Sequence, residues 1–394
     1  MNVLFLMKVY HIGGIEVVTA VLANSFVKHG HKVCIATFNP PVGMMIEKTD
    51  SKIAIYTLGN YECSKANVKK LRNILVENKI DVVINQWGLP YIPCKILNKA
   101  KRGLSIKTIA VYHNQIDTNA RIKNVKIAIT STNNPIKKFL LNIKKKIVSA
   151  ITSASMRYVY KHSDVYLVLS ESHVDLFKRF TRINNPQKLM VQTNPVTIDT
   201  SAFQYAQSDK QNEIIYVGRI DYNQKRVYRV IDTWALLEDK FPDWQLTVIG
   251  DGTERENVEQ QAKSLNLKHV NFEGFQNPEP FYKRASLLLL TSEYEGFPLV
   301  LAESMGYGVV PIVYESYSAV RDIISDGING IIVPYNSNGY DARLAAHIIS
   351  GIITDNNKRN SLAMAAIDKS KSYNIENVYS SWENTFKRMI NEQK

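Results

Sequence analysis

Short apolar runs alternate with helically spaced segments along the first half of the chain. Five runs have the length and composition of buried strands: Val3–Leu6, Val33–Thr37, Val82–Ile84, Thr108–Val111 and Val165–Leu169. Three segments between them repeat apolar residues at helical intervals: Glu16–Lys28, Asn67–Asn78 and Ser172–Phe180. Strands that alternate with helices predict a doubly wound parallel sheet.

The same pattern restarts after a break. Turn residues at Val191–Pro195 end the first block, and the polar stretch Gln204–Asn212 predicts a linker before a new apolar run at Ile214. Further strands are expected at Leu246–Ile249, Val270–Phe272, Leu287–Leu290 and Val309–Val313, and helices at Arg226–Lys240, Glu254–Leu265, Pro298–Met305 and Ala342–Ile353. The sequence therefore predicts two α/β domains that face each other across a ligand-binding cleft.

The length and the tail of the chain fit this division. A chain of 394 residues is too long for one ordinary hydrophobic core. After Ile375, apolar residues recur every fourth position, at Val378, Trp382, Phe386 and Ile390. Such an amphipathic helix needs a surface to cover.

The hydrophobic pattern predicts neither a signal peptide nor a membrane-spanning helix. The apolar N-terminal run ends at Lys8, as expected of a first buried strand rather than a signal peptide. No stretch reaches the ~18 apolar residues that a spanning helix requires. Cys34, Cys63 and Cys94 have neither disulfide nor metal spacing. We expect a cytoplasmic protein.

The formal net charge of +13 is concentrated in one segment. No acidic residue lies between Asp117 and Asp164, whereas ten basic residues do. From Pro135 onward this segment predicts an amphipathic helix whose apolar stripe is Ile136, Phe139, Leu140, Ile143, Ile147 and Ile151. The flanking lysines are Lys137, Lys138, Lys144, Lys145 and Lys146.

A basic amphipathic helix is typical of proteins that lie on an anionic membrane surface. Five lysines at about 1 kcal/mol each suffice for reversible docking. The alternative is a helix packed into the core with a solvated basic face. Nucleic-acid binding is disfavoured, because no aromatic residues interleave with the basic ones and no nucleic-acid module is present.

The segment from Glu295 to Glu303, EGFPLVLAE, carries the most specific chemistry. It follows the apolar run Leu287–Leu290, and Pro298 is expected at the first position of a helix. Free helix amides favour an anion such as a diphosphate, and carboxylates accept hydrogen bonds from sugar hydroxyls. The segment predicts a nucleotide-sugar site; the alternative is a capping carboxylate beside a solvated one.

Three further positions are candidates. Gly13-Gly14 follows the first strand and precedes a helix, where a backbone could approach a ligand or simply turn tightly. Gly218-Arg219 and Lys225 follow the first strand of the second domain, where the cations could hold phosphate or be solvated. His113 ends an apolar strand and is either functional or structural. No D-x-D or other metal-binding cluster occurs, so no metal is expected.

Several motifs occur together in a recognisable order. They are Gly13-Gly14-Ile15-Glu16, Val217-Gly218-Arg219 with Lys225, Gly250-Asp251-Gly252, Gly274-Phe275, and Glu295 to Met305 followed by Gly308. This order resembles the retaining GT-B glycosyltransferases of family 4, over nearly the whole chain. The resemblance implies two Rossmann-like domains, residues 1–198 for the acceptor and 199–374 for the nucleotide sugar, with a final helix, 375–394, crossing back onto the first.

The resemblance also implies roles for individual residues. Arg219 and Lys225 would clamp the diphosphate, while Glu295 would hold the donor sugar and Glu303 the ribose. His113 would reach the donor sugar from the first domain. The remaining donor-binding positions would be Gly14, Gly218, Gly274, Phe275, Phe297, Pro298, Leu299 and Val300. Arg219, Lys225, Glu295 and His113 would form the catalytic set.

The chain departs from the family pattern in places. Ser304 replaces the usual alanine, Pro298 replaces a commoner glycine, and Asn85–Gly88 lack the histidine that many relatives carry there. Relatives with Glu-Gly-Phe-Pro often use UDP-linked galactose-type or N-acetylhexosamine donors.

Taken together, these features predict a metal-independent retaining glycosyltransferase. It would move a hexose or N-acetylhexosamine from a UDP-linked nucleotide sugar to a lipid-linked glycan in cell-surface polysaccharide synthesis. It would act as a peripheral protein on the inner face of the membrane, without a cofactor. The alternatives are a GT-B nucleotide-sugar epimerase, a GDP-mannose-dependent transferase and a non-catalytic nucleotide-binding module.

Overall fold

The computed structural model describes the chain through residue 391 and its side chains through residue 389. Positions 392–394 of the expected tail, and the side chain of Ile390, lie outside the described residues. The chain forms two compact units. Unit 1 contains Met1–Thr197 and the segment that begins at Asn374, and unit 2 contains Ile198–Tyr373.

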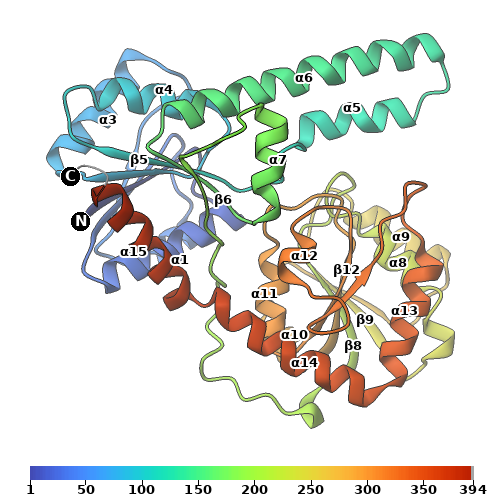
Figure 1. Ribbon diagram of the computed structural model, residues 1–394. Helices are drawn as coiled ribbons and strands as arrows, with labels where there is room; N and C mark the ends of the chain where they lie inside the picture. Colours follow the sequence, from blue (N-terminus) through green and yellow to red (C-terminus); the bar gives the residue numbers. More distant parts are fainter. Residues whose placement is uncertain (392–394) are drawn as a thin grey trace. The chain divides into compact units, whose positions relative to one another are not determined.

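Unit 1 is built on a seven-stranded sheet in the order β3-β2-β1-β4-β5-β6-β7, in which neighbouring strands run parallel. The strands are β1 (Asn2–Met7), β2 (Lys32–Thr37), β3 (Ala54–Thr57), β4 (Val82–Asn85), β5 (Lys107–Tyr112), β6 (Val165–Val168) and β7 (Leu189–Val191). The helices are α1 (Gly14–Lys28), α2 (Gly43–Glu47), α3 (Lys65–Glu77), α4 (Tyr91–Ala100), α5 (Ala120–Thr130), α6 (Pro135–Lys161), α7 (Ser172–Thr181) and α15 (Ile375–Asn391). Figure 1 shows helices on both faces of this sheet.

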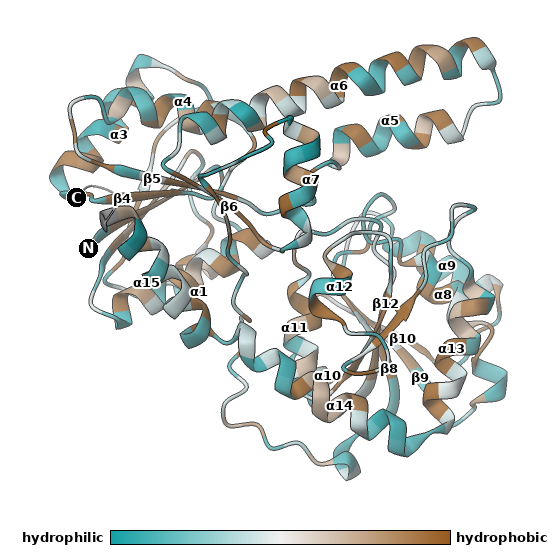
Figure 2. Cartoon of the chain, in the orientation of Figure 1, coloured by the Kyte–Doolittle hydropathy of each residue, from teal (hydrophilic) through white to brown (hydrophobic). Residues whose placement is uncertain are grey.

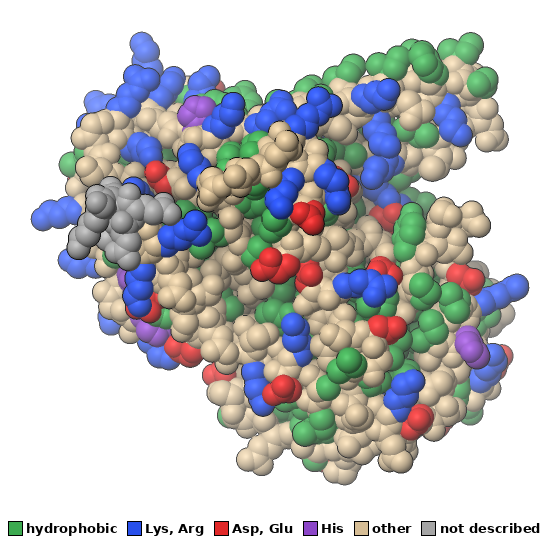
Figure 3. Space-filling view, in the orientation of Figure 1, with side chains coloured by type: hydrophobic (Ala, Val, Ile, Leu, Met, Phe, Trp, Pro, Cys, Tyr) green, Lys and Arg blue, Asp and Glu red, His purple; other side chains and the backbone are tan. Residues whose placement is uncertain are grey.

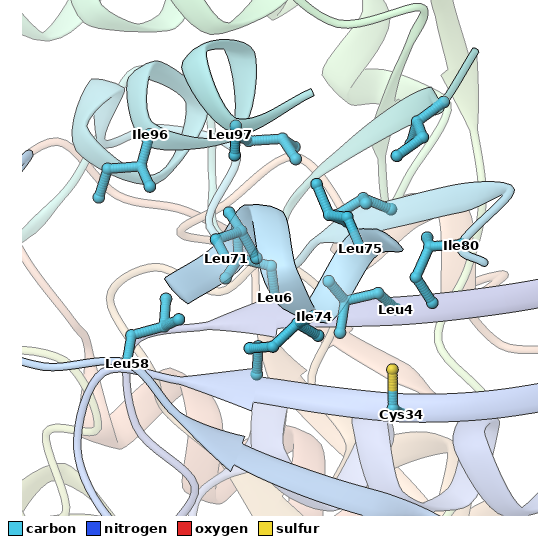
Figure 4. Close-up of a cluster of buried hydrophobic side chains, with 14 of the residues drawn as sticks. Leu4, Leu6, Cys34, Leu58, Leu71, Ile74, Leu75, Ile80, Ile96 and Leu97 are labelled. Carbon is cyan, nitrogen blue, oxygen red and sulfur yellow. The ribbon is translucent and has the colours of Figure 1, made fainter. Parts of the chain in front are cut away.

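The sheet of unit 1 is held by apolar side chains that the strands and helices share. Leu4 and Leu6 of β1 pack with Leu71, Ile74 and Leu75 of α3 in one buried cluster, part of which is drawn in Figure 4. Figure 2 shows the same contrast over the whole chain, with hydrophobic strands inside and hydrophilic helix faces outside. Burial on both faces explains why the central strands are continuous apolar runs.

Unit 2 repeats the plan with a six-stranded sheet in the order β10-β9-β8-β11-β12-β13. The strands are β8 (Gln211–Val217), β9 (Gln245–Ile249), β10 (Val270–Gly274), β11 (Ala285–Leu290), β12 (Val310–Tyr314) and β13 (Ile331–Val333). The helices are α8 (Tyr228–Trp234), α9 (Arg255–Ser264), α10 (Glu279–Arg284), α11 (Leu299–Gly306), α12 (Val320–Ile323), α13 (Ala342–Thr354) and α14 (Asn356–Ser370). Short 3-10 turns lie at Gln207–Asp209, Glu238–Lys240 and Lys371–Tyr373.

The prediction of doubly wound parallel sheets is confirmed, but some elements differ. The pattern missed the short edge strands β3, β7 and β13, which are three or four residues long. The expected helix Arg226–Lys240 is interrupted after Trp234. Pro298 is the N-cap of α11 rather than its first residue, so the expectation for its position was wrong by one residue. Either position suits a residue that has no N–H to donate.

Helix α15 packs against α1 in unit 1 through an aromatic cluster. The ring of Phe26 lies 5.8 Å from Tyr379, 5.9 Å from Trp382 and 5.6 Å from Phe386, edge-on in each case. Lys28 adds an ion pair to Glu376 at 2.8 Å. The amphipathic face of the tail thus covers an apolar surface of its own unit.

Helices α5 and α6 form a hairpin that projects from the sheet of unit 1 (Figure 1). The second half of α6 is anchored by Met156, Val159 and Tyr160, which belong to a buried cluster. In its first half, the predicted stripe from Ile136 to Ile151 is 41–71% exposed. The alternative of a core-packed helix therefore does not hold for this stretch.

Two of the five lysines do not flank the stripe. At 100° per residue, Lys137, Lys144 and Lys146 lie beside the apolar stripe of α6, whereas Lys138 and Lys145 lie toward the opposite side. Figure 3 shows hydrophobic side chains along the α6 arm with basic ones nearby. Within residues 1–391, no helix combines the length and apolarity needed to cross a membrane.

Trp382→Ala should lower the free energy of unfolding of unit 1 by about 3–5 kcal/mol, because it removes a buried aromatic side chain from the α1–α15 contact. Urea unfolding followed by circular dichroism measures the change. Tyr91→Ala is the control, since this aromatic residue of the same unit is exposed. Equal losses in the two variants would contradict the role assigned to α15.

Candidate active site

The candidate residues of unit 2 follow neighbouring parallel strands. Gly218 directly follows β8, Gly250 follows β9, Gly274 ends β10, and Glu295 lies five residues beyond the end of β11. These four strands are adjacent in the order β10-β9-β8-β11 and run parallel. Their carboxyl ends therefore meet at one edge of the sheet, where ligands bind in open α/β folds.

Glycine is required where β8 and β9 end. Gly218 and Gly250 have φ values of +146° and +144°, which other residues rarely adopt. A Cβ atom on Gly250 would lie 1.9 Å from the carbonyl oxygen of Gly218. The close contact of these two backbones packs the loop after β8 against the loop after β9. It thereby fixes the backbone position of Arg219, which follows Gly218.

The loop after β8 is folded around Asp221. Its Oδ1 accepts hydrogen bonds from the backbone N–H groups of Gln224, at 2.6 Å, and Lys225, at 3.4 Å. Its Oδ2 accepts one from Nε of Arg219 at 2.9 Å. One carboxylate thus shapes the turn and orients the Arg219 guanidinium, whose side chain remains largely exposed.

Glu295 and Lys225 form a buried ion pair. The Lys225 Nζ lies 2.7 Å from Oε1 of Glu295, and the two side chains are only 15% and 9% exposed. Gln224 donates from Nε2 to Oε2 of Glu295 at 3.1 Å and accepts from Arg219 at the same distance. The structure therefore joins three predicted residues, Arg219, Lys225 and Glu295, in one hydrogen-bonded network.

Glu303 lies in the second turn of α11 and is buried. Its Oε2 accepts a hydrogen bond from the Tyr282 hydroxyl at 3.2 Å. Burial, and next the Glu303 carboxylate, raise the pKa of Tyr282 well above its usual value, so this hydroxyl keeps its proton and remains a donor. The carboxylate of Glu303 is thereby held in place on the helix.

The start of α11 contributes backbone rather than side chains. The first-turn N–H groups of Leu299 and Val300 have no acceptor within an α-helix. Phe297 is buried, and its ring packs 5.1 Å from that of Tyr373, so its side chain stabilises the turn. Gly274 has a φ of +72°, and the next residue, Phe275, is 61% exposed at the same sheet edge.

The remaining two candidates belong to unit 1. Gly14 is the first residue of α1, after β1, and His113 follows β5, so both lie at the carboxyl edge of that sheet. Nε2 of His113 lies 2.7 Å from Oε1 of Gln86. Burial lowers the pKa of His113 to about 3, so the imidazole is neutral at neutral pH.

Several residues of these networks were missed in the sequence. Asp221 and Gln224 lie between Arg219 and Lys225, and the spacing of this loop was the only local signal for them. Tyr282 is 21 residues from its partner Glu303, and Gln86 is 27 residues from His113. A hydrogen bond between such distant positions leaves no periodic pattern in the sequence.

A cavity alone does not mark this site. One of about 590 Å³ is lined by Tyr205, Lys210, Asn212 and Ser286, among others. Asn212 and Ser286 lie at the amino ends of β8 and β11, so this cavity is at the opposite sheet edge from Glu295. The candidate site is therefore defined by the side chains at the carboxyl edge of the sheet and not by this cavity.

Comparison with solved structures defines the class of fold. The chain superimposes on the Anabaena protein HepE in complex with UDP and glucose with a TM-score of 0.75 and 16% identity, covering 98% of this chain and all of that one. It matches the lipopolysaccharide outer core galactosyltransferase WaaB, in its apo form, with a TM-score of 0.65 and 20% identity over the full length of both chains. The fold is GT-B.

Family models identify the protein more closely. Residues 12–200 match the model described as Glycosyltransferase Family 4, and residues 197–369 match Glycosyl transferases group 1. The chain belongs to the family-4 glycosyltransferases, a family of retaining enzymes, as its motifs predicted.

Individual relatives extend the comparison. The chain is 26% identical over 393 residues, 97% of each sequence, to a Campylobacter jejuni enzyme named as GalNAc-α-(1→4)-GalNAc-α-(1→3)-diNAcBac-PP-undecaprenol α-1,4-N-acetyl-D-galactosaminyltransferase. It is 36% identical to the lipopolysaccharide 1,6-galactosyltransferase of Salmonella typhimurium over 151 residues, which is 36% of this chain and 41% of the relative.

Gly250→Ala should destabilise unit 2 by about 3 kcal/mol or more, because the new Cβ would collide with the Gly218 carbonyl in a backbone conformation that alanine disfavours. Gly351→Ala is the matched control. Its Cβ would meet nothing within 4 Å inside α13, so that change should stabilise the unit by about 0.5–1 kcal/mol. Thermal unfolding of both variants measures the contrast, and a neutral Gly250→Ala would contradict the close approach of the two loops.

Proposed function

We propose that this glycosyltransferase moves a hexose or N-acetylhexosamine from a UDP-sugar to a lipid-linked glycan, with retention at the anomeric carbon. The observation that carries the proposal is the network of Arg219, Gln224, Lys225 and Glu295, set beside the start of α11. It combines cations for a diphosphate with a fixed carboxylate for hydroxyl groups.

The donor would bind along the carboxyl edge of the unit 2 sheet. Arg219 and Lys225 would hold the diphosphate together with the first-turn amides of α11, and Gly218 would let the backbone approach it. Glu303, held by Tyr282, would accept hydrogen bonds from the ribose hydroxyls. The base would lie at Gly274 and Phe275, whose exposed ring offers a stacking surface.

The sugar would be held by two acceptors. Glu295, fixed through both of its oxygens, would accept from donor-sugar hydroxyls in unit 2, and His113 would contact the donor sugar from unit 1. Holding the sugar by neutral hydroxyls leaves its anomeric carbon free to react. UDP is present in the HepE complex, together with glucose, and in the S. aureus TarM complex, together with α-GlcNAc-glycerol and fondaparinux, which supports a uridine nucleotide.

The reaction would be driven by stabilising the leaving group. The bond between the anomeric carbon and the phosphate oxygen breaks, and its electron pair leaves with UDP. The acceptor oxygen then attacks the same face and passes its proton to the departing phosphate. Arg219, Lys225 and the α11 amides stabilise the charge that develops on the diphosphate in the transition state.

Two observations support a lipid-linked acceptor: the name of one relative and the surface of helix α6 in unit 1. The Campylobacter jejuni enzyme is named for a glycan carried on PP-undecaprenol. In this chain, the exposed apolar stripe of α6 and its flanking lysines form a basic amphipathic surface. Such a surface would lie on an anionic membrane, at its inner face, and bring the enzyme to a lipid-linked acceptor.

A panel of UDP- and GDP-sugars, followed by nucleotide release with and without a lipid-linked acceptor, tests the reaction. Acceptor-dependent release of UDP is expected. Release of UDP with a free 2-epimer, in the absence of acceptor, would instead show an epimerase. Preference for GDP-mannose would show the alternative transferase, and binding without turnover would contradict an enzymatic role.

Glu295→Ala should lower kcat by about 10²–10³-fold while leaving UDP binding measurable, because it removes the carboxylate that holds the sugar. Glu303→Ala should mainly weaken UDP binding, by about tenfold or more, since a charged hydrogen-bond acceptor for the ribose is lost. Calorimetry with UDP and a turnover assay measure the two effects.

Asp368→Ala is the control for these two variants. It removes an exposed carboxylate on α14 of the same unit, which is paired with Lys371. Its binding and turnover should match those of the wild type. Near-wild-type turnover in Glu295→Ala would refute the site assignment.

Removal of Lys137, Lys144 and Lys146 together, by substitution with alanine, should weaken binding to anionic liposomes by about 10²-fold. Each basic residue near the surface contributes about 1 kcal/mol. Removal of Lys138 and Lys145 should matter less per charge, because they lie toward the other side of the helix. Co-sedimentation with phosphatidylglycerol vesicles measures both.

The apolar part of the same surface needs its own variant. Phe139→Asp should also release the protein, since it places a charge within the exposed stripe. All three variants should retain UDP binding, because their positions belong to unit 1. Sedimentation that none of them alters would contradict the membrane surface.

A further inference from the structure

The imidazole of His113 has one nitrogen whose partner is missing. Nδ1 is buried, and no group among the described residues forms a hydrogen bond with it. Buried polar atoms in folded proteins nearly always have a partner, so an exception calls for an explanation. The chemical nature of a missing partner depends on whether Nδ1 carries a proton.

The other ring nitrogen, Nε2, contacts Gln86, and this contact shows which nitrogen carries the proton. It lies 2.7 Å from Oε1 of Gln86, an oxygen that can only accept, so Nε2 must carry the proton. The Gln86 amide must then direct its oxygen toward His113. The contact made by its nitrogen supports this orientation.

Thr19 provides that support from helix α1. Its hydroxyl donates its single proton to the carbonyl oxygen of Ile15 at 2.7 Å. Its oxygen can then only accept from Gln86, whose Nε2 lies 3.1 Å away. The nitrogen of the amide thus faces Thr19 and the oxygen faces His113.

The surroundings of Thr19 and Gln86 hold these hydrogen bonds in place. Thr19 and Gln86 are both buried, and the backbone N–H of Gln86 donates to the carbonyl oxygen of Leu6 in β1 at 2.9 Å. Gln86 directly follows β4, and His113 directly follows its neighbour β5. The chain of hydrogen bonds therefore joins α1 to the carboxyl ends of two adjacent strands.

We propose that Gln86, oriented by Thr19, is a positioning residue that fixes His113 as the tautomer with its proton on Nε2, and that Nδ1 accepts a hydrogen bond from a hydroxyl group of the donor sugar. The proposal rests on the proposed function for the identity of that ligand. It deepens that function by selecting the sugar. A donor whose uncharged sugar presents a hydroxyl at this place satisfies Nδ1. A uronate sugar would instead place its carboxylate against the lone pair of Nδ1.

Nitrogen NMR of protein labelled with ¹⁵N-histidine tests the tautomer directly. The signal of His113 among the eight histidines is identified by its loss in His113→Ala. In the wild type, Nε2 should be protonated and Nδ1 should not. In Gln86→Leu, where the acceptor is gone, the signals should shift toward a mixture of the two tautomers.

Two further variants keep the test decisive if Gln86→Leu folds poorly. Thr19→Val removes the oxygen that orients the amide and should produce a partial shift toward the same mixture. Gln192→Leu is the matched control, because Gln192 is a buried glutamine of the same unit that bonds to Ser381 instead. It should leave the His113 signals unchanged.

Kinetics then separate positioning from folding. Gln86→Leu should lower the turnover of the neutral UDP-sugar about tenfold, as expected for one misoriented hydrogen bond, with little change in the Kd for UDP. Gln86→Glu should not restore the lost turnover, because a carboxylate beside Nε2 favours the imidazolium, whose Nδ1 is a donor. Wild-type enzyme should use the neutral UDP-sugar in preference to the matching UDP-uronate, and this preference should diminish in Gln86→Leu.

The outcomes distinguish the inference from the function on which it rests. A proton on Nδ1 in the wild type, or an unchanged tautomer in both Gln86→Leu and Thr19→Val, would overturn the inference even if the enzyme transfers sugar. Equal use of the neutral sugar and the uronate would overturn its specificity part. Absence of UDP binding would overturn the proposed function, while the NMR result would still report on the Thr19–Gln86–His113 chain.

Discussion

The ion pair between Lys225 and Glu295 is the interaction on which the site of unit 2 depends. Burying two charges is costly unless each is paired and its remaining hydrogen-bonding capacity is satisfied. Here Gln224 occupies the second oxygen of Glu295, and Asp221 fixes the backbone that carries Lys225. The arrangement is therefore set before any ligand arrives, so binding does not require these side chains to become ordered.

Parallel strands explain why this chemistry collects at one place. Because β8, β9, β10 and β11 all run in the same direction, their loops share one edge, and the glycines let those loops approach each other. The start of α11 adds backbone N–H groups there, and Glu303 adds a carboxylate one turn later. Cationic side chains, carboxylates and backbone N–H groups thus meet at one sheet edge through a repetition of strand, loop and helix.

The sequence was sufficient for the architecture and for naming the candidate side chains, but not for the residues that hold those side chains in place. Central strands such as β1 and β11 are buried on both faces and form clear apolar runs, whereas the short edge strand β3 is only partly buried and gives a weak signal. Glu295 and Lys225 were recognised from local motifs. Gln224, Tyr282 and Gln86 were not, because their roles arise from hydrogen bonds between elements that only the folded chain brings together.

The return of α15 to unit 1 has a consequence for biosynthesis. Phe26 is made early, whereas Trp382 and Phe386, which cover it, are translated only after the whole of Ile198–Tyr373. At ~5–20 residues per second, synthesis of that insertion takes roughly ten to forty seconds. During this interval the apolar face of α1 lacks its cover, so the nascent chain exposes an apolar surface to which chaperones can bind.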